Sequence, residues 1–177
     1  QPIIFAALCG LLVAILSIAT AGYASGNGYA ETRASLIDGQ AIPWWFGLAK
    51  LVSTLLSSAS GIPGGLFSPS LAVGAGIGSM ITPIFTFADP RVIMLLMTVG
   101  YFAGVVQSPL TAVVIVMEMT SDKNMVIPLM ATSLFAAGIS RLISREPIYH
   151  ALARGYYASV FRIHGTPDVS PGSPSGR

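Results

Sequence analysis

Charged residues are scarce in this sequence. Lys, Arg, Asp and Glu make up 9% of its 177 residues, whereas roughly a quarter of the residues in a soluble domain are charged. The formal net charge is only +2 and the basic residues form no run, so we expect no nucleic-acid partner. In their place, 53% of the residues are hydrophobic and the mean hydropathy is +0.74. This composition predicts an integral, multi-pass membrane protein.

Cysteine is also scarce, because Cys9 is the only one. A single cysteine excludes an internal disulfide, and its apolar neighbours favour a packing role. The first apolar segment has no basic residues before it and no obvious cleavage site, so we expect no signal peptide. Since the chain begins with Gln1 rather than Met, we expect it to be a piece of a longer protein whose other helices complete any shared site.

One uncharged run, residues 51–88, is too long for a single membrane crossing of about 20 residues. Near its middle, residues 60–69 are Ser-Gly-Ile-Pro-Gly-Gly-Leu-Phe-Ser-Pro, with three glycines and two prolines in ten residues. Proline lacks the amide hydrogen that a helix needs, and glycine costs about 1 kcal/mol in a helix interior. The run therefore predicts two helices with a break between them. At membrane depth such a break is tolerated only where it is buried in protein or lines an aqueous cavity.

The helix after this break is predicted to begin near Leu66, and its first turn carries backbone amides without intrahelical acceptors. These amides and the positive end of the helix dipole favour an anion. We therefore predict an anion site made of backbone groups at this position. The alternative is a glycine and proline hinge, or a loop between two ordinary membrane spans, because the motif alone is weakly specific.

Further apolar segments predict the remaining helices. Gln107, Ser108 and Pro109 interrupt one of them, so we expect a second broken helix, with Ser108 capping the part that starts at Pro109. Two broken helices are typical of transporters whose binding site lies near the bilayer midplane. Trp44 and Trp45 suit the headgroup level of a membrane. The expected helices are 2–20, 44–60, 66–87, 92–106, 110–119, 125–139 and 147–162, with a short surface helix at 30–37 inside an aqueous connection at 22–42.

Several residues allow more than one interpretation. Lys50 is expected to extend to the membrane interface rather than to act as an intramembrane ligand. Glu118 is expected at a helix end or in a buried hydrogen bond, although a proton-relay or ion-coordinating role stays open. Gly74 and Gly78 form a GxxxG pair, which commonly serves helix packing. Tyr149 is either an interfacial anchor or an inward hydroxyl donor to an anion.

Basic residues gather toward the end of the chain. Four arginines stand between residues 141 and 162, opposed there by Glu146 alone. The positive-inside rule therefore predicts a cytoplasmic C-terminus. Residues 165–177 are rich in Pro, Ser and Gly, which is typical of a disordered tail or linker. We thus divide the chain into a membrane domain, residues 1–164, and a cytoplasmic tail, residues 165–177.

Four motifs together resemble the CLC family of chloride channels and chloride/proton exchangers. They are residues 60–69, Ser-Pro-Leu-Thr at 108–111, Val-Met-Glu-Met-Thr at 116–120 and Glu-Pro-Ile-Tyr at 146–149. The resemblance, which extends to about Arg162, implies an all-α membrane protein that forms the second half of the inverted-repeat CLC fold, with broken and re-entrant helices. The family's first half supplies a Ser-containing GSGIP motif, the gating glutamate of GxEGP and, in exchangers, an internal proton-transfer acid, and none of these is present in this sequence.

The resemblance implies chloride ligands at three positions. The backbone amides of Leu66 and Phe67 and the hydroxyl of Tyr149 are expected to coordinate a central chloride. No side-chain ligand is assigned to Ser60, because the Gly-Gly-Leu-Phe at 64–67 places its motif in the second half. We expect no catalytic residue, no metal site and no cofactor, with chloride as the transported ligand.

The function implied by the resemblance is chloride transport, expected as chloride/proton antiport, by a protein that is not an enzyme. A passive chloride channel is an alternative, because the acidic residues that distinguish an exchanger from a channel lie outside this sequence. A non-transporting membrane assembly module is another alternative.

The expected partners are chloride, the lipid bilayer, the N-terminal half of the same protein and a second copy in a homodimer. The resemblance implies that the two copies are joined through helices that match residues 109–119 and 126–142. Without the cytoplasmic CBS domains of many eukaryotic members, we expect a bacterial inner-membrane protein.

Overall fold

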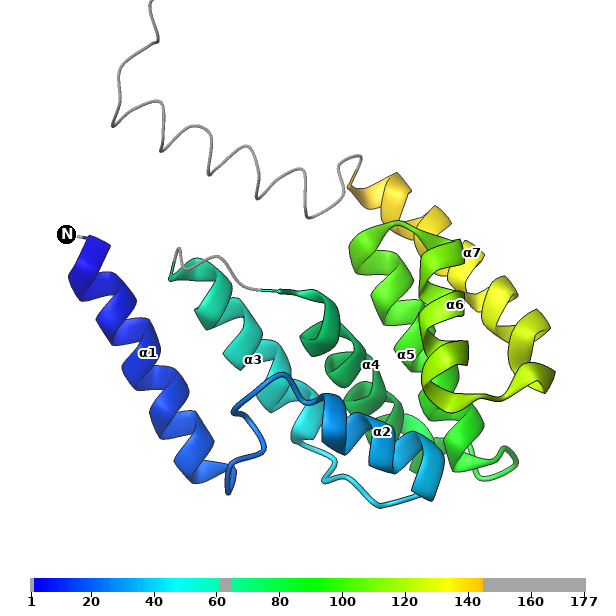
Figure 1. Ribbon diagram of the computed structural model, residues 1–177, viewed down its shortest axis with the longest axis horizontal. Helices are drawn as coiled ribbons and strands as arrows, with labels where there is room; N and C mark the ends of the chain where they lie inside the picture. The colour runs from blue at the N-terminus through cyan, green and yellow to red at the C-terminus, as the bar shows by residue number, and fades with distance from the viewer. Residues whose placement is uncertain (1, 61–64, 145–177) are drawn as a thin grey trace, which may run out of the picture. The chain divides into compact units, whose positions relative to one another are not determined.

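The computed structural model describes residues 2–60 and 65–144. This part of the chain is helical and has no β-strand, which confirms the predicted all-α class (Figure 1). The helix predicted over 147–162 and the tail at 165–177 lie outside the described residues. The described part contains α1 (Pro2–Ala19), α2 (Tyr29–Asp38), α3 (Phe46–Ala59), α4 (Phe67–Ile81), α5 (Pro90–Val106), α6 (Pro109–Thr120) and α7 (Val126–Ile143), with 3-10 turns at Thr82–Ile84 and Lys123–Met125.

Two helical segments of the described chain are long and apolar enough to cross a membrane, Phe67–Ile84 and Lys123–Ile143. The apolar helices α1, α3, α5 and α6 are shorter. Short apolar helices are what the interrupted runs of the sequence predict. The chain is divided before α4 and again between α5 and α6, at both of the positions where proline and its neighbours predict a break.

Proline also explains where the predicted helix boundaries differ from the observed ones. The sequence predicts one helix over 66–87, but α4 ends at Ile81 and the chain tightens into a 3-10 turn that contains Pro83. Pro128, expected to interrupt the next helix, falls in the first turn of α7. A first-turn amide has no acceptor within its helix, so the missing hydrogen costs nothing there. At its other end α7 continues to Ile143, beyond the predicted end at residue 139.

Glycine brings α4 very close to both of its neighbours. A methyl group added at Gly74 would lie 2.7 Å from the Cα of Thr98 in α5, and one added at Gly78 would lie 2.7 Å from the Cα of Met94. On its other side, α4 places Gly76 directly against the backbone of α3 at Gly47. The packing role predicted for the Gly74 and Gly78 pair is therefore confirmed, and α4 is held between α3 and α5 (Figure 1).

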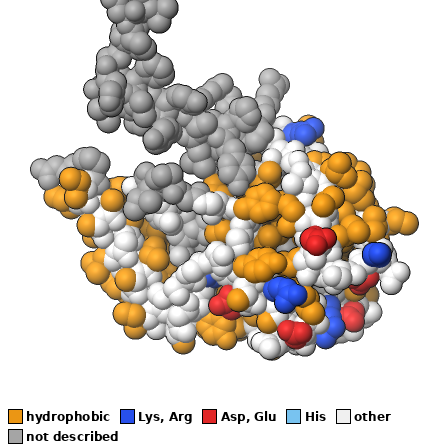
Figure 2. All heavy atoms as spheres, in the orientation of Figure 1, with side chains coloured by type: hydrophobic (Ala, Val, Ile, Leu, Met, Phe, Trp, Pro, Cys, Tyr) orange, Lys and Arg blue, Asp and Glu red, His pale blue; other side chains and the backbone are white. Residues whose placement is uncertain are grey.

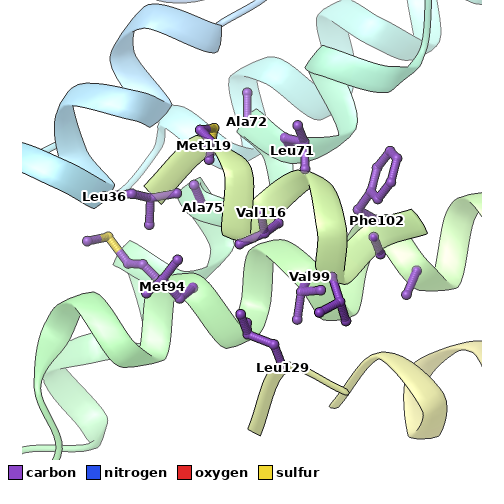
Figure 3. Close-up of a cluster of buried hydrophobic side chains, with 14 of the residues drawn as sticks. Leu36, Leu71, Ala72, Ala75, Met94, Val99, Phe102, Val116, Met119 and Leu129 are labelled. Atoms are coloured by element: carbon purple, nitrogen blue, oxygen red, sulfur yellow. The ribbon is translucent and has the colours of Figure 1, made fainter. Parts of the chain in front are cut away.

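A cluster of buried apolar side chains joins α4 and α5 to α2, α6 and α7 (Figure 3). Val99 and Phe102 of α5, Val116 of α6 and Leu129 of α7 are fully enclosed in it. Lipid is as apolar as these side chains, so their contribution in a membrane comes from close packing rather than from escape from water. On α1, Cys9 is free and buried, in agreement with its predicted packing role.

The short helix predicted over 30–37 is present as α2, but it is not confined to the surface. Thr32, Ser35 and Leu36 are all buried. The Ser35 hydroxyl lies 3.6 Å from the Met94 sulfur of α5. Since Tyr29, Arg33 and Asp38 are exposed, α2 is the expected surface helix, and its buried face packs against helices that are distant in sequence.

Large apolar side chains also cover much of the outside. On α1, Ile3 and Ile18 are each 82% exposed, and on α7 Phe135 is 75% and Leu142 is 87% exposed. Figure 2 shows hydrophobic side chains over most of the visible face, with most of the charged ones gathered toward its lower edge. An apolar exterior of this extent suits lipid or further membrane helices rather than water.

The glycine contacts predict a clear difference between two Gly→Ala substitutions. Gly76→Ala should lower thermal stability in detergent by about 1–3 kcal/mol, because its methyl group would push α4 away from α3. Gly138→Ala is the matched control, since Gly138 lies in the interior of α7 with nothing within 4 Å of the added methyl group. A melting curve followed by size-exclusion chromatography measures both variants, and equal melting temperatures would contradict the close-packing argument.

Candidate anion site at the start of α4

The candidate anion site is the start of α4, directly after the first predicted break. The helix begins at Phe67, and Leu66 is the residue that precedes its first helical position. The Leu66 carbonyl closes the first turn by accepting the Ser70 amide at 3.1 Å and the Ser70 hydroxyl at 2.6 Å. Pro69 falls inside this turn, where a helix needs no amide hydrogen. The predicted helix start near Leu66 is thereby confirmed.

The first amides of α4 have no acceptor within the helix, as at any helix N-terminus. No side chain among the described residues caps them. The Leu66 side chain is buried, while that of Phe67 is 37% exposed. Residues 51–88 carry no charge, so the segment offers an anion the backbone amides, the helix dipole and uncharged hydroxyl groups. Such an arrangement can hold an anion without supplying a full positive charge.

Contacts with two other segments fix the start of α4. The Phe67 ring packs edge-on against Phe102 of α5, with ring centroids 4.5 Å apart and an interplanar angle of 75°. The Ser68 hydroxyl lies 3.5 Å from the Asn27 carbonyl oxygen in the loop before α2, which is a weak contact. The aromatic contact with α5 is therefore the main side-chain restraint on the first residue of α4 among the described ones.

The three predicted chloride ligands are placed differently. Leu66 and Phe67 lie together at the start of α4, whereas Tyr149 lies outside the described residues, so its hydroxyl contact stays a prediction.

The second break also agrees with the sequence, because α6 starts at Pro109. The capping role predicted for Ser108 is wrong in detail. Its hydroxyl pairs with the Thr111 hydroxyl at 2.9 Å and makes no bond to a helix amide.

A hydrogen-bond network that the sequence does not predict joins the ends of α5 and α7. Gln107 ends α5 in the left-handed conformation (φ 56°), and its side chain donates to the Ser144 carbonyl at 2.8 Å and to the Ser140 hydroxyl at 3.3 Å. Ser140 donates to the Gly104 carbonyl at 2.6 Å, and Arg141 donates to the Gln107 carbonyl at 3.1 Å. Each helix thus satisfies carbonyl groups at the C-terminal end of the other.

The two helix ends in this network have the same polarity. Gly100 lies near Thr132 and Gly104 near Ser140, so α5 and α7 run in the same direction. Their negative dipole ends are therefore side by side. The Arg141 guanidinium places a positive charge there, which stabilises both ends. The only sign of this network in the sequence is an arginine in the last turn of an apolar helix. That sign is ambiguous, because the positive-inside rule also predicts an arginine at the cytoplasmic end of a membrane helix.

Lys50 corrects one of the predictions. Its side chain is 1% exposed, so it does not extend to a membrane interface. The Nζ atom donates to the Ser25 carbonyl and, at 3.2 Å, to the Gly26 carbonyl, and it lies 5.8 Å from the centroid of the Phe46 ring. The loop before α2 folds back over α3 and supplies these acceptors. Local sequence does not reveal them, because they come from residues about 25 positions earlier in the chain.

Glu118 is exposed close to the end of α6, which agrees with the helix-end interpretation. It lines an open pocket of about 420 Å³ together with Arg33 and Tyr29 of α2 and apolar side chains of α6. None of the residues that line this pocket belongs to α4. The pocket is therefore separate from the candidate anion site.

Broken apolar helices, an apolar exterior and an uncharged helix start at one of the breaks define an all-α integral membrane protein with discontinuous helices. The family model described as voltage gated chloride channel matches residues 1–141. The chain belongs to this family.

Several relatives in the family carry the name H(+)/Cl(-) exchange transporter ClcA. The protein of Vibrio campbellii is 35% identical over 112 residues, which are 59% of this chain and 24% of that protein. The one from Vibrio parahaemolyticus is 33% identical over the same shares of the two chains. The protein of Yersinia pestis is 31% identical over 153 residues, 82% of this chain and 31% of the relative. The chain thus spans a quarter to a third of the length of the curated relatives it matches.

The network at the ends of α5 and α7 predicts a role for Arg141 in stability. Arg141→Met should lower the free energy of unfolding in detergent by about 1–3 kcal/mol, because the Gln107 carbonyl loses its charged donor and two helix dipoles lose their counter-charge. Lys123→Met is the control, since Lys123 is exposed and lies in the turn that precedes α7. Equal thermal unfolding temperatures for the two variants would show that the Arg141 contact contributes nothing.

Proposed function

We propose that this chain supplies the second half of the membrane domain of a chloride/proton exchanger. The observation that carries the proposal is the start of α4, where an uncharged break places the amides of Leu66 and Phe67 at a helix N-terminus inside an apolar protein. Membership of the voltage-gated chloride channel family supports chloride as the anion. The names of the exchange transporter relatives support antiport with protons.

In this proposal chloride is bound by dipoles rather than by a basic side chain. The amides of Leu66 and Phe67 point toward the anion from one helix start, and the Tyr149 hydroxyl donates to it from a second one. Because no full counter-charge is present among these ligands, the anion binds strongly enough to enter the site and weakly enough to leave it. The anion crosses without any covalent change, so the protein needs no catalytic residue, metal or cofactor and is not an enzyme.

The remaining part of the site is proposed to come from the N-terminal half of the same protein. The protein is further proposed to form a homodimer through α6 and α7, whose exposed apolar side chains include Leu110, Val114, Ile127 and Phe135. Contacts of this kind between membrane helices depend on packing, which apolar faces and small residues permit. The proposed location is the inner membrane of a bacterium, with the arginine-rich C-terminal end in the cytoplasm.

A passive chloride channel is the second candidate function. It shares the same anion site, and the acidic groups that would separate the two mechanisms are not found in this chain. A non-transporting assembly module is a third candidate, since the chain corresponds to a limited share of each relative.

Ion flux in liposomes tests the proposal. The full-length protein should move chloride against its own gradient when a proton gradient is applied. Chloride flux that never couples to protons would favour the channel, and a protein that carries no anion at all would favour the assembly module. Empty liposomes with the same gradients are the control.

Tyr149→Phe tests the proposed hydroxyl donor. The variant should fold normally and bind chloride about ten- to 150-fold more weakly, because one hydrogen bond to a charged group is lost, which is worth about 1.5–3 kcal/mol. Calorimetric titration with chloride in detergent measures the affinity. Tyr29→Phe is the control, since Tyr29 is an exposed residue that lines the separate pocket beside α6. An unchanged dissociation constant for Tyr149→Phe would remove this residue from the site.

A further inference from the structure

The contact between α4 and α5 follows a regular repeat. Gly78 lies against Met94, and Gly74 lies against Thr98. Positions four residues apart on one helix therefore meet positions four residues apart on the other, and the two helices run in opposite directions. Four residues are close to one helical turn, so this repeat keeps one edge of α4 against one edge of α5.

One further step along the repeat reaches the first turn of α4. It brings Ser70 to the level of Phe102, which is fully buried. Ser70 is small, and its hydroxyl is bonded back to the Leu66 carbonyl of its own helix. The Phe102 ring extends from this level to the ring of Phe67. The contact between the two helices thus ends in an aromatic pair at the first residue of α4. Phe102 of this pair belongs to the buried cluster shown in Figure 3.

The aromatic pair of Phe67 and Phe102 restrains the start of α4, where few other contacts do so. The glycine contacts fix the helix at residues 74 and 78, about two and three turns beyond its first residue. The segment before the helix is rich in glycine and proline, no described side chain caps the first amides, and the contact of Ser68 with Asn27 is long. Edge-to-face aromatic pairs have a preferred geometry, so a fixed Phe102 ring restricts the position of Phe67.

We infer that Phe102 is a positioning residue for anion binding, which it serves by fixing the ring of Phe67 and with it the amides at the start of α4. This inference rests on the proposed function. Phe102 does not contact the anion in this scheme. Its effect on chloride binding passes through Phe67.

Phe102→Leu tests the inference. Leucine fills much of the space of the ring but has no aromatic edge, so the variant should fold and bind chloride about two- to tenfold more weakly, as loss of one aromatic pair predicts. Val99→Ala is the matched control, because Val99 is also fully buried on α5 and makes no ring contact with Phe67. It should lower the melting temperature and leave chloride affinity unchanged.

Calorimetric titration of the full-length protein with chloride, beside a melting curve, separates the outcomes. An unchanged affinity in Phe102→Leu, or an equal loss of affinity in Val99→Ala, would overturn the positioning role. A double-mutant cycle adds a second check, since Phe67→Leu and the double variant should bind as weakly as Phe102→Leu if both act through the one contact. Additive losses would also overturn it. A parent protein that neither binds nor transports chloride would instead refute the proposed function.

Discussion

Close packing of α4 between α3 and α5 is the constraint on which the rest of the structure depends. Gly76 meets α3, and Gly74 and Gly78 meet α5, so helix backbones approach each other without intervening side chains. In a membrane this proximity maximises van der Waals contact, which replaces the hydrophobic effect as the driving force. Because α4 is held on both sides, its first residue lies at a defined place, with Phe67 against Phe102.

The helix ends near the two breaks differ in how their backbone groups are satisfied. At the ends of α5 and α7, Gln107, Ser140 and Arg141 satisfy carbonyl groups with side-chain donors. At the starts of α4 and α6, the residue that precedes the helix caps no amide with its side chain. An unsatisfied polar group inside a membrane protein costs several kcal/mol, so such amides favour a ligand that accepts hydrogen bonds.

Two cations of the apolar helices, Lys50 and Arg141, are engaged in structural contacts. Lys50 is held by carbonyls of the loop before α2, and Arg141 by the carbonyl of Gln107. Neither contact involves a residue of the first turn of α4. The proposed anion site therefore depends on oriented backbone dipoles, whose attraction is weaker than that of a buried cation. Reversible binding is a requirement of transport, and a site without a full charge meets it.

The sequence by itself determined the helical class, the two breaks and the start of a helix near Leu66, because proline, glycine and long uncharged runs act through local backbone chemistry. It also indicated that Gly74 and Gly78 serve packing. Only the tertiary structure decided that Lys50 is buried, that Ser108 pairs with Thr111, and that the ends of α5 and α7 satisfy each other. The Lys50 contacts and the network between α5 and α7 depend on acceptors and charges from segments distant in the chain, which come together only when the helices pack. The contact between Ser108 and Thr111 is local, and the geometry of the helix start decides it.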